Sequence, residues 1–104
     1  EERFTRSFAR GKFRIKKWGR VRIERELRAR NISSYNIKQG LSEIDPAEYD
    51  HTLFELADKK FVQTSEKHPL KKRKKVADFL LRRGFESQKV YTILLELEKQ
   101  NKSK

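Results

Sequence analysis

Apolar residues recur every three or four positions along most of the chain, which is the spacing of one face of an α-helix. Ile23 and Leu27 are four apart, and arginines project from the other side of the same segment. A second stripe follows at Ile37, Leu41 and Ile44. No segment alternates apolar and polar residues for long enough to require a β-strand. The pattern predicts an all-α protein.

The same pattern occurs twice in the sequence. A shift of 53 residues places Arg22–Ile44 over Lys75–Leu97. Six apolar positions then coincide: Ile23 with Val76, Leu27 with Leu80, Ile32 with Phe85, Ile37 with Val90, Leu41 with Leu94, and Ile44 with Leu97. The shift also places Asn31 on Gly84, and these residue types most readily adopt the left-handed backbone that ends a helix. Each copy is therefore predicted to be a helix, a tight turn and a second helix.

Capping residues mark where the second helix of each copy begins. After the first turn, Ser33 or Ser34 can accept a hydrogen bond from the free amides of the next helix. After the second turn, the helix is expected to restart at Glu86 or Ser87.

A further helix is predicted before each of these pairs. Asp45-Pro46 is a start signal, since Asp caps a helix and Pro fits its first turn, and helical spacing continues to about Val62. The N-terminal segment has similar spacing at Phe4, Phe8, Ala9 and Phe13. A shift of 48 residues, not 53, places Phe13 on Phe61. Linkers of different length are therefore expected before the second helix of each unit.

The predicted architecture is two tandem copies of a three-helix repeat, at residues 1–44 and 45–99, followed by a disordered tail at residues 100–104. One such unit buries little apolar surface, so stacked copies would stabilise one another. We expect an elongated and curved all-α molecule.

Charge adds a second feature to this picture. The 104 residues have a net charge of +12 that is unevenly placed. Residues 1–30 contain twelve Lys or Arg and four acids, and residues 67–83 contain eight and one. Residues 31–66 reverse the balance, with three bases and seven acids. Two basic segments separated by an acidic one predict a positive face, which would attract a polyanion, a membrane surface or an acidic protein.

Several classes of protein are excluded or disfavoured. The chain has no cysteine, so it can form neither a disulfide nor a thiolate metal site. No apolar run approaches the roughly 18 to 20 residues that cross a bilayer, and no signal peptide opens the chain, so a cytoplasmic location is expected. The sequence contains no methionine and starts at Glu1, so the native beginning is expected to lie upstream.

The usual residues of catalysis are missing. His51 and His68 lie in different segments, and neither has a second histidine or cysteine to complete a metal site. The four glycines are scattered and match no phosphate-binding motif. Glu24 and Arg28 form a helical i,i+4 pair, which contributes to helix stability and not to chemistry. We expect no enzyme activity, no cofactor, no metal and no small-molecule substrate.

The basic segments are the candidate site for binding nucleic acid or a protein filament. The first contains Arg14, Lys16, Lys17, Trp18, Arg20, Arg22, Arg25 and Arg28. The second contains Lys71, Lys72, Lys74, Lys75 and Arg82. Cations along a helix suit phosphates, and arginine adds bidentate geometry.

Two details qualify a nucleic-acid interpretation. Trp18 can stack on a base, but the favoured interpretation is that it anchors the turn beside Gly19. A helix-turn-helix reads DNA through its second helix. Here the arginines lie mainly before the turn, whereas the segment at residues 33–44 is neutral to acidic.

Two stretches of the sequence are similar to the repeats of a known protein family. The stretch ERFTRSFARGKFRIKKWGRVRIEREL, followed by RARNIS, is similar to the family's middle repeat. In that family a basic segment leads to a glycine-containing turn and an Ile-x-x-Glu-Leu helix, matched here by Gly19, Ile23, Glu26 and Leu27. FLLRRGF at residues 79–85 is similar to the final-repeat motif. By these motifs the sequence resembles the RecX family, which regulates the RecA recombinase. That family has three such repeats, and the resemblance covers the second and third.

The resemblance implies a bacterial, non-enzymatic regulator in recombination, DNA repair and the SOS response. Its partner would be the RecA filament on single-stranded DNA, whose growth, strand exchange and ATP hydrolysis it would limit. No family motif fixes the basic residues individually. Two alternatives stay open: a helical module that binds nucleic acid directly without RecA, and a structural scaffold.

Overall fold

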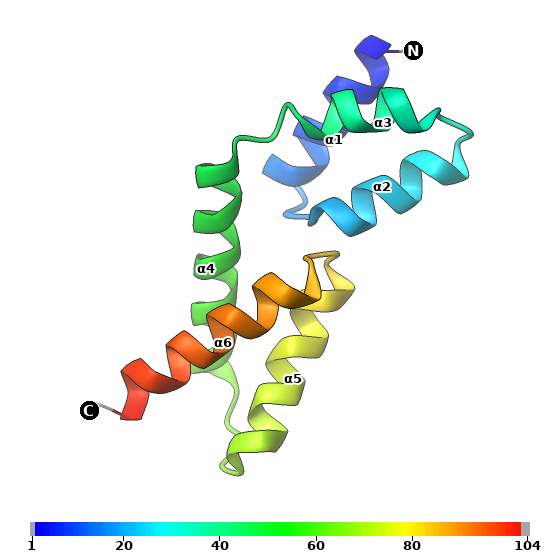
Figure 1. Ribbon diagram of the computed structural model, residues 1–104. Helices are drawn as coiled ribbons and strands as arrows, with labels where there is room; N and C mark the ends of the chain where they lie inside the picture. Colours follow the sequence, from blue (N-terminus) through cyan, green and yellow to red (C-terminus); the bar gives the residue numbers. More distant parts are fainter. Residues whose placement is uncertain (1, 103–104) are drawn as a thin grey trace.

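The computed structural model describes residues 2–102, and this part of the chain contains helices and no strand (Figure 1). The first repeat consists of α1 (Glu2–Arg14), α2 (Arg20–Ala29) and α3 (Ser34–Leu41). The second consists of α4 (Pro46–Gln63), α5 (Pro69–Arg82) and α6 (Ser87–Lys102). The predicted all-α fold with two three-helix repeats is confirmed.

Three residues with a left-handed backbone end the helices that precede tight turns. Lys17, Asn31 and Gly84 have φ angles of 58°, 63° and 99°. After Asn31 and Gly84 the next amide donates back to the carbonyl five residues before it, closing a Schellman turn: Ile32 to Leu27 (3.1 Å) and Phe85 to Leu80 (3.3 Å). After Lys17 the Trp18 amide reaches one residue further back, to the Lys12 carbonyl (3.1 Å). The predicted stops at Asn31 and Gly84 are confirmed, whereas the stop at Lys17 was not predicted.

Side-chain caps open two of the helices as expected. Ser33 Oγ accepts a hydrogen bond from the Asn36 amide at 3.1 Å, and Asp45 Oδ2 accepts one from the Glu48 amide at 2.9 Å. These contacts satisfy amides that have no partner inside the helix. Helix α6 begins at Ser87, and the Glu86 side chain before it pairs with Arg20 of the first repeat.

The expectation of linkers of different length was wrong. Residues 15–19 and 64–68 form connections of equal length between the first and second helices of each repeat. The extra residues of the second repeat lengthen its helices instead: α5 has 14 residues where α2 has 10, and α4 has 18 where α1 has 13. Lys71 and Lys72 lie on the added turn of α5 and have no counterpart in the first repeat.

The C-terminal boundary also differs from the expectation. Helix α6 continues to Lys102, so a disordered tail is wrong for residues 100–102. The Asn101 side-chain amide donates to the Leu97 carbonyl at 2.8 Å, as expected near the end of a helix. Residues 103–104 of the predicted tail lie outside the described part.

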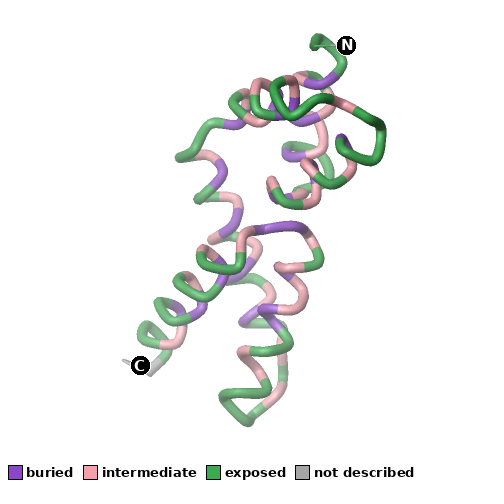
Figure 2. The backbone as a smooth tube through the Cα atoms, turned by 45° about the vertical axis from the view of Figure 1, so that its right-hand side comes forward, coloured by how far each residue is buried: buried purple, intermediate pink, exposed green. Residues whose placement is uncertain are grey.

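A single cluster of buried apolar side chains runs through both repeats. Figure 2 shows buried positions recurring along the helices, as the periodicity predicts. The two copies are not equally buried: Phe85 and Leu94 are fully enclosed, but their counterparts Ile32 and Leu41 are only half-buried. The second repeat therefore has the fuller core.

The repeats are arranged end to end. Helices α1, α2 and α3 pack on one another, as do α4, α5 and α6 (Figure 1). The molecule measures 49 × 23 × 20 Å with a radius of gyration of 15.2 Å, which confirms the expected elongation. Among the described residues, no helix combines the length and apolar character needed to cross a membrane.

Candidate interaction surface at the junction of the repeats

Two glycines bring the backbones of the repeats into direct contact. The Gly19 amide donates to the Arg83 carbonyl at 2.8 Å, and the Val21 amide donates to the Gly84 carbonyl at 2.9 Å. A Cβ at Gly19 would lie 2.3 Å from the Gly84 oxygen, and a Cβ at Gly84 would lie 2.3 Å from Cβ of Arg22. Only glycine fits this approach, so the α1–α2 connection and the α5–α6 turn lock together.

Tyr49 of α4 ties these two connections to each other. Its hydroxyl accepts a hydrogen bond from the Arg20 amide at 2.9 Å and donates one to Glu86 at 2.5 Å. Arg20 completes the triangle, with Nη1 3.1 Å from Glu86 and its guanidinium 3.8 Å from the Tyr49 ring centre. Burial raises the pKa of the fully buried Tyr49 hydroxyl well above its usual range, and the bond to the Glu86 carboxylate raises it further.

Aromatic rings packed at tilted angles extend the junction from Tyr49. The Tyr49 ring lies 5.6 Å from Phe13 of the first repeat and 5.4 Å from Phe85 of the second. At the rim, the Arg83 guanidinium donates to the Lys16 carbonyl at 2.7 Å. Backbone, aromatic and charged contacts thus fix one repeat against the other.

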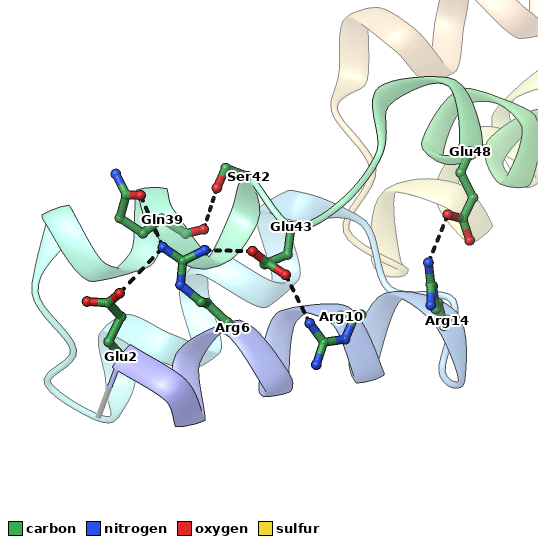
Figure 3. A network of polar contacts seen from close by, with 8 residues as sticks. All are labelled: Glu2, Arg6, Arg10, Arg14, Gln39, Ser42, Glu43 and Glu48. Atoms are coloured by element: carbon green, nitrogen blue, oxygen red, sulfur yellow. Dashed lines mark hydrogen bonds and ion pairs between the residues drawn. The ribbon is translucent and has the colours of Figure 1, made fainter.

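Ion pairs along α1 stabilise the first repeat and reach the second (Figure 3). Glu43 lies between two arginines, accepting from Arg6 at 2.6 Å and from Arg10 at 2.9 Å. Arg14, one of the predicted site residues, pairs with Glu48 of α4 at 3.3 Å. These arginines hold helices together, and their charge is largely neutralised.

Three other members of the first predicted segment also make internal contacts. Arg20 belongs to the Tyr49 triangle. Trp18 packs edge-on against Phe8, and the Arg22 guanidinium lies 4.2 Å from its ring centre. Trp18 therefore anchors the turn, which agrees with the favoured interpretation of this residue.

Two of the four lysines in the second segment pair with acids of the same chain. Lys74 pairs with Asp78 at 3.4 Å and Lys75 with Glu66 at 3.2 Å. Lys72 lies 4.1 Å from the ring centre of Phe61. Glu66 also accepts a hydrogen bond from the His68 amide, and this bond is the main cause of the lowered pKa of Glu66. The Lys75 side chain lowers that pKa further. Lys71 is exposed and has no ion-pair partner among the described residues.

The remaining cations of the first segment have different surroundings. Arg28 forms the predicted pair with Glu24 at 2.9 Å. Lys16 and Lys17 are exposed with no ion pair within residues 2–102, and Lys17 lines a hollow on the side of α4. The predicted basic residues therefore line different hollows, and several of them pair with acids of the same chain.

Arg25 and Arg82 are the exception, because the fold brings them together from different repeats. Both side chains are exposed and have no ion-pair or aromatic partner in the described part of the chain. They line one open hollow of about 430 Å³ with Asp78 and Leu81. Arg25 also lines an adjoining hollow of about 380 Å³ with Val21, Glu24 and Arg28. A groove therefore runs along α2 onto α5 across the junction.

The described residues show no arrangement typical of a metal or catalytic centre. No group of three His, Cys, Asp or Glu is close enough to hold a metal ion in this part of the chain. His51 contacts Glu55 at 3.3 Å, and both side chains are largely exposed. The groove between α2 and α5 can instead offer charged and apolar surface to a binding partner.

Comparison with known proteins gave matches to two family models. The model of the second three-helix domain of RecX matches residues 1–41, and that of the third three-helix domain matches residues 48–94. The chain belongs to the RecX family. The matches follow the order of the two repeats in the structure and cover most of α1 to α6. RecX proteins are in general non-catalytic regulators of RecA. No curated protein and no solved structure matched the chain.

The residues that form the junction of this RecX-family protein were largely missed by sequence reasoning. Tyr49 has no signal beyond the helical spacing that follows Asp45-Pro46, and Glu86 was expected only as a possible restart of the next helix. Gly19 was the one available signal, since it stands in the family's glycine-containing turn. Val21 and Leu81, which line the groove, carry no sequence signal.

Proposed function

We propose that this chain regulates RecA by binding the RecA filament on single-stranded DNA, and that it limits filament growth, strand exchange and ATP hydrolysis. The observation that carries the proposal is the pair of family matches, to the second and third RecX domains in the order of the structural repeats. Such a role would place the protein in the bacterial cytoplasm, in recombination, DNA repair and the SOS response.

The shape of the molecule supports this proposal. A body 49 Å long, with its repeats fixed by the Tyr49 triangle and the glycine contact, can follow a polymer instead of binding one small site. Because the junction is rigid, little orientational freedom between the repeats is lost on binding. A filament offers many equivalent sites, so a rigid body that covers part of its surface can limit the addition of further subunits.

The test is the ATPase of RecA on single-stranded DNA, measured with increasing amounts of the 104-residue chain. The proposal expects progressive inhibition that saturates, together with slower strand exchange. A variant in which Gly84→Val disrupts the junction is expected to inhibit less, whereas Gly11→Ala, far from any contact, is the matched control. Unchanged ATPase at saturating amounts of the chain would overturn the proposal.

The alternative is a module that binds nucleic acid directly. It predicts tight binding to DNA without RecA, with affinity that falls steeply as salt is raised, because several phosphates would be neutralised. The pairing of Arg14, Arg28, Lys74 and Lys75 with acids of the same chain reduces the charge available for this mode. We therefore favour the filament.

A further inference from the structure

We propose that the groove between α2 and α5 binds an acidic protein segment with aliphatic side chains, and that Arg25 and Arg82 each bind a carboxylate of this segment. The inference rests on the proposed function in one respect: a regulator of RecA has a protein partner, and the inference assigns this groove to a protein and not to nucleic acid. It is argued from the free charge, the apolar surface and the position of the groove.

The groove contains two arginines that have no partner, Arg25 and Arg82. Among the arginines that the structure describes, all but Arg3, Arg25 and Arg82 make an ion pair, a side-chain hydrogen bond or an aromatic contact. Arg3 lies near the start of α1, away from the groove. Arg25 and Arg82 line a common hollow with Leu81 and with Asp78, whose carboxylate is paired with Lys74 at 3.4 Å. A planar guanidinium suits a carboxylate through two parallel hydrogen bonds.

Apolar surface lies beside these charges. Val21 is 47% exposed and lines the hollow next to Arg25, and Leu81 is half-buried and forms part of the wall shared with Arg82. Aliphatic side chains of a partner would bury this surface. A sugar–phosphate backbone would leave it without a partner.

The surroundings of the groove disfavour nucleic acid. Arg28, Lys74 and Lys75 are each paired with an acid of the same chain. Trp18, the only tryptophan, is packed against Phe8 with a cation near its ring, so it offers no open platform for a base. Nucleic-acid sites rely on dense phosphate contacts and stacking aromatic rings. Two free cations beside aliphatic surface fit an acidic peptide better.

The position of the groove links binding to the fold. Arg25 belongs to the first repeat and Arg82 to the second, so their separation depends on the glycine contact and the Tyr49 triangle. A partner can therefore bind both arginines at once only when the two repeats are held in this arrangement.

The test uses two labelled probes, a peptide in which glutamates alternate with leucines and an oligothymidylate of similar length, with binding measured by fluorescence anisotropy. The double variant Arg25→Ala, Arg82→Ala is expected to lose about tenfold or more in affinity for the peptide. Val21→Ser is expected to lose about threefold for the peptide and nothing for the oligonucleotide. The matched control is Arg3→Ala with Lys67→Ala, which removes the same charge from exposed positions outside the groove.

The control is expected to bind the peptide within about twofold of the wild type, since diffuse charge is screened by salt. The proposal is overturned if the peptide does not bind, or if both double variants weaken it equally. It is also overturned if the oligonucleotide binds more tightly than the peptide and depends on Arg25 and Arg82 alone. Inhibition of RecA without peptide binding would refute only this inference, and peptide binding without any effect on RecA would refute only the proposed function.

Discussion

Gly19 and Gly84 meet backbone to backbone across the boundary between the two repeats. Two hydrogen bonds cross this boundary, from the Gly19 amide to Arg83 and from the Val21 amide to Gly84. The approach leaves no room for a Cβ on either glycine. The position of one repeat against the other is therefore built into two residues 65 positions apart in the sequence.

Gly19→Ala should lower the free energy of unfolding by about 3 kcal/mol or more, because the new Cβ would overlap the Gly84 carbonyl and the turns would have to separate. Gly11→Ala is the control: nothing lies near its Cβ position, and alanine in a helix should raise stability by about 0.5–1 kcal/mol. Urea unfolding measures both. Equal effects of the two substitutions would contradict the proposed lock.

Tyr49→Phe should lower the free energy of unfolding by about 1–3 kcal/mol at neutral pH, since Glu86 and the Arg20 amide each lose a buried partner. Tyr35→Phe, at an exposed position, is the control and should have little effect. Chemical unfolding monitored by circular dichroism compares the two variants. A Tyr49→Phe protein as stable as the Tyr35→Phe control would refute the role of the hydroxyl.

The same tyrosine predicts a pH dependence of stability. Its pKa is raised in the folded state above the ordinary value of 10, so its contribution is complete below pH 10 and is lost as pH rises toward the folded-state value. The wild type should therefore lose stability above pH 10, and Tyr49→Phe should lose less over the same range. Parallel alkaline curves for the two proteins would argue against this account.

Lys17→Gly should stabilise the protein by about 1 kcal/mol, because glycine removes the strain of a left-handed backbone at the end of α1. Lys17→Ala keeps the Cβ and should have little effect. Lys16→Gly, next to it and without a positive φ, should be neutral or slightly destabilising. Thermal unfolding ranks the three variants, and a stabilising Lys16→Gly would remove the backbone explanation.

Much of the fold could be predicted from local sequence. Apolar spacing indicated the helices, and Asn31, Gly84, Ser33 and Asp45 marked ends that the structure confirms. The left-handed backbone at Lys17 could not be predicted, because in the sequence a lysine at such a turn looks like any other surface lysine. The extra residues before Val76 were assigned to a linker because helix length depends on packing as well as on local pattern.

The candidate surface was less predictable, because a count of charges says nothing about their partners. The lysines at 71–75 look like one patch, but Lys74 and Lys75 are paired with Asp78 and Glu66 in the fold. Arg25 and Arg82 lie far apart in the sequence and come together only through the junction. Tyr49 looked like an ordinary core residue, since its hydroxyl contacts belong to other elements.

The most direct measurement of the central claim is co-sedimentation of the chain with RecA assembled on single-stranded DNA, compared with RecA alone and with DNA alone. The account predicts that the chain sediments with the filament, and that much less is retained by either component by itself. Equal retention on bare DNA, with no increase when RecA is added, would contradict it.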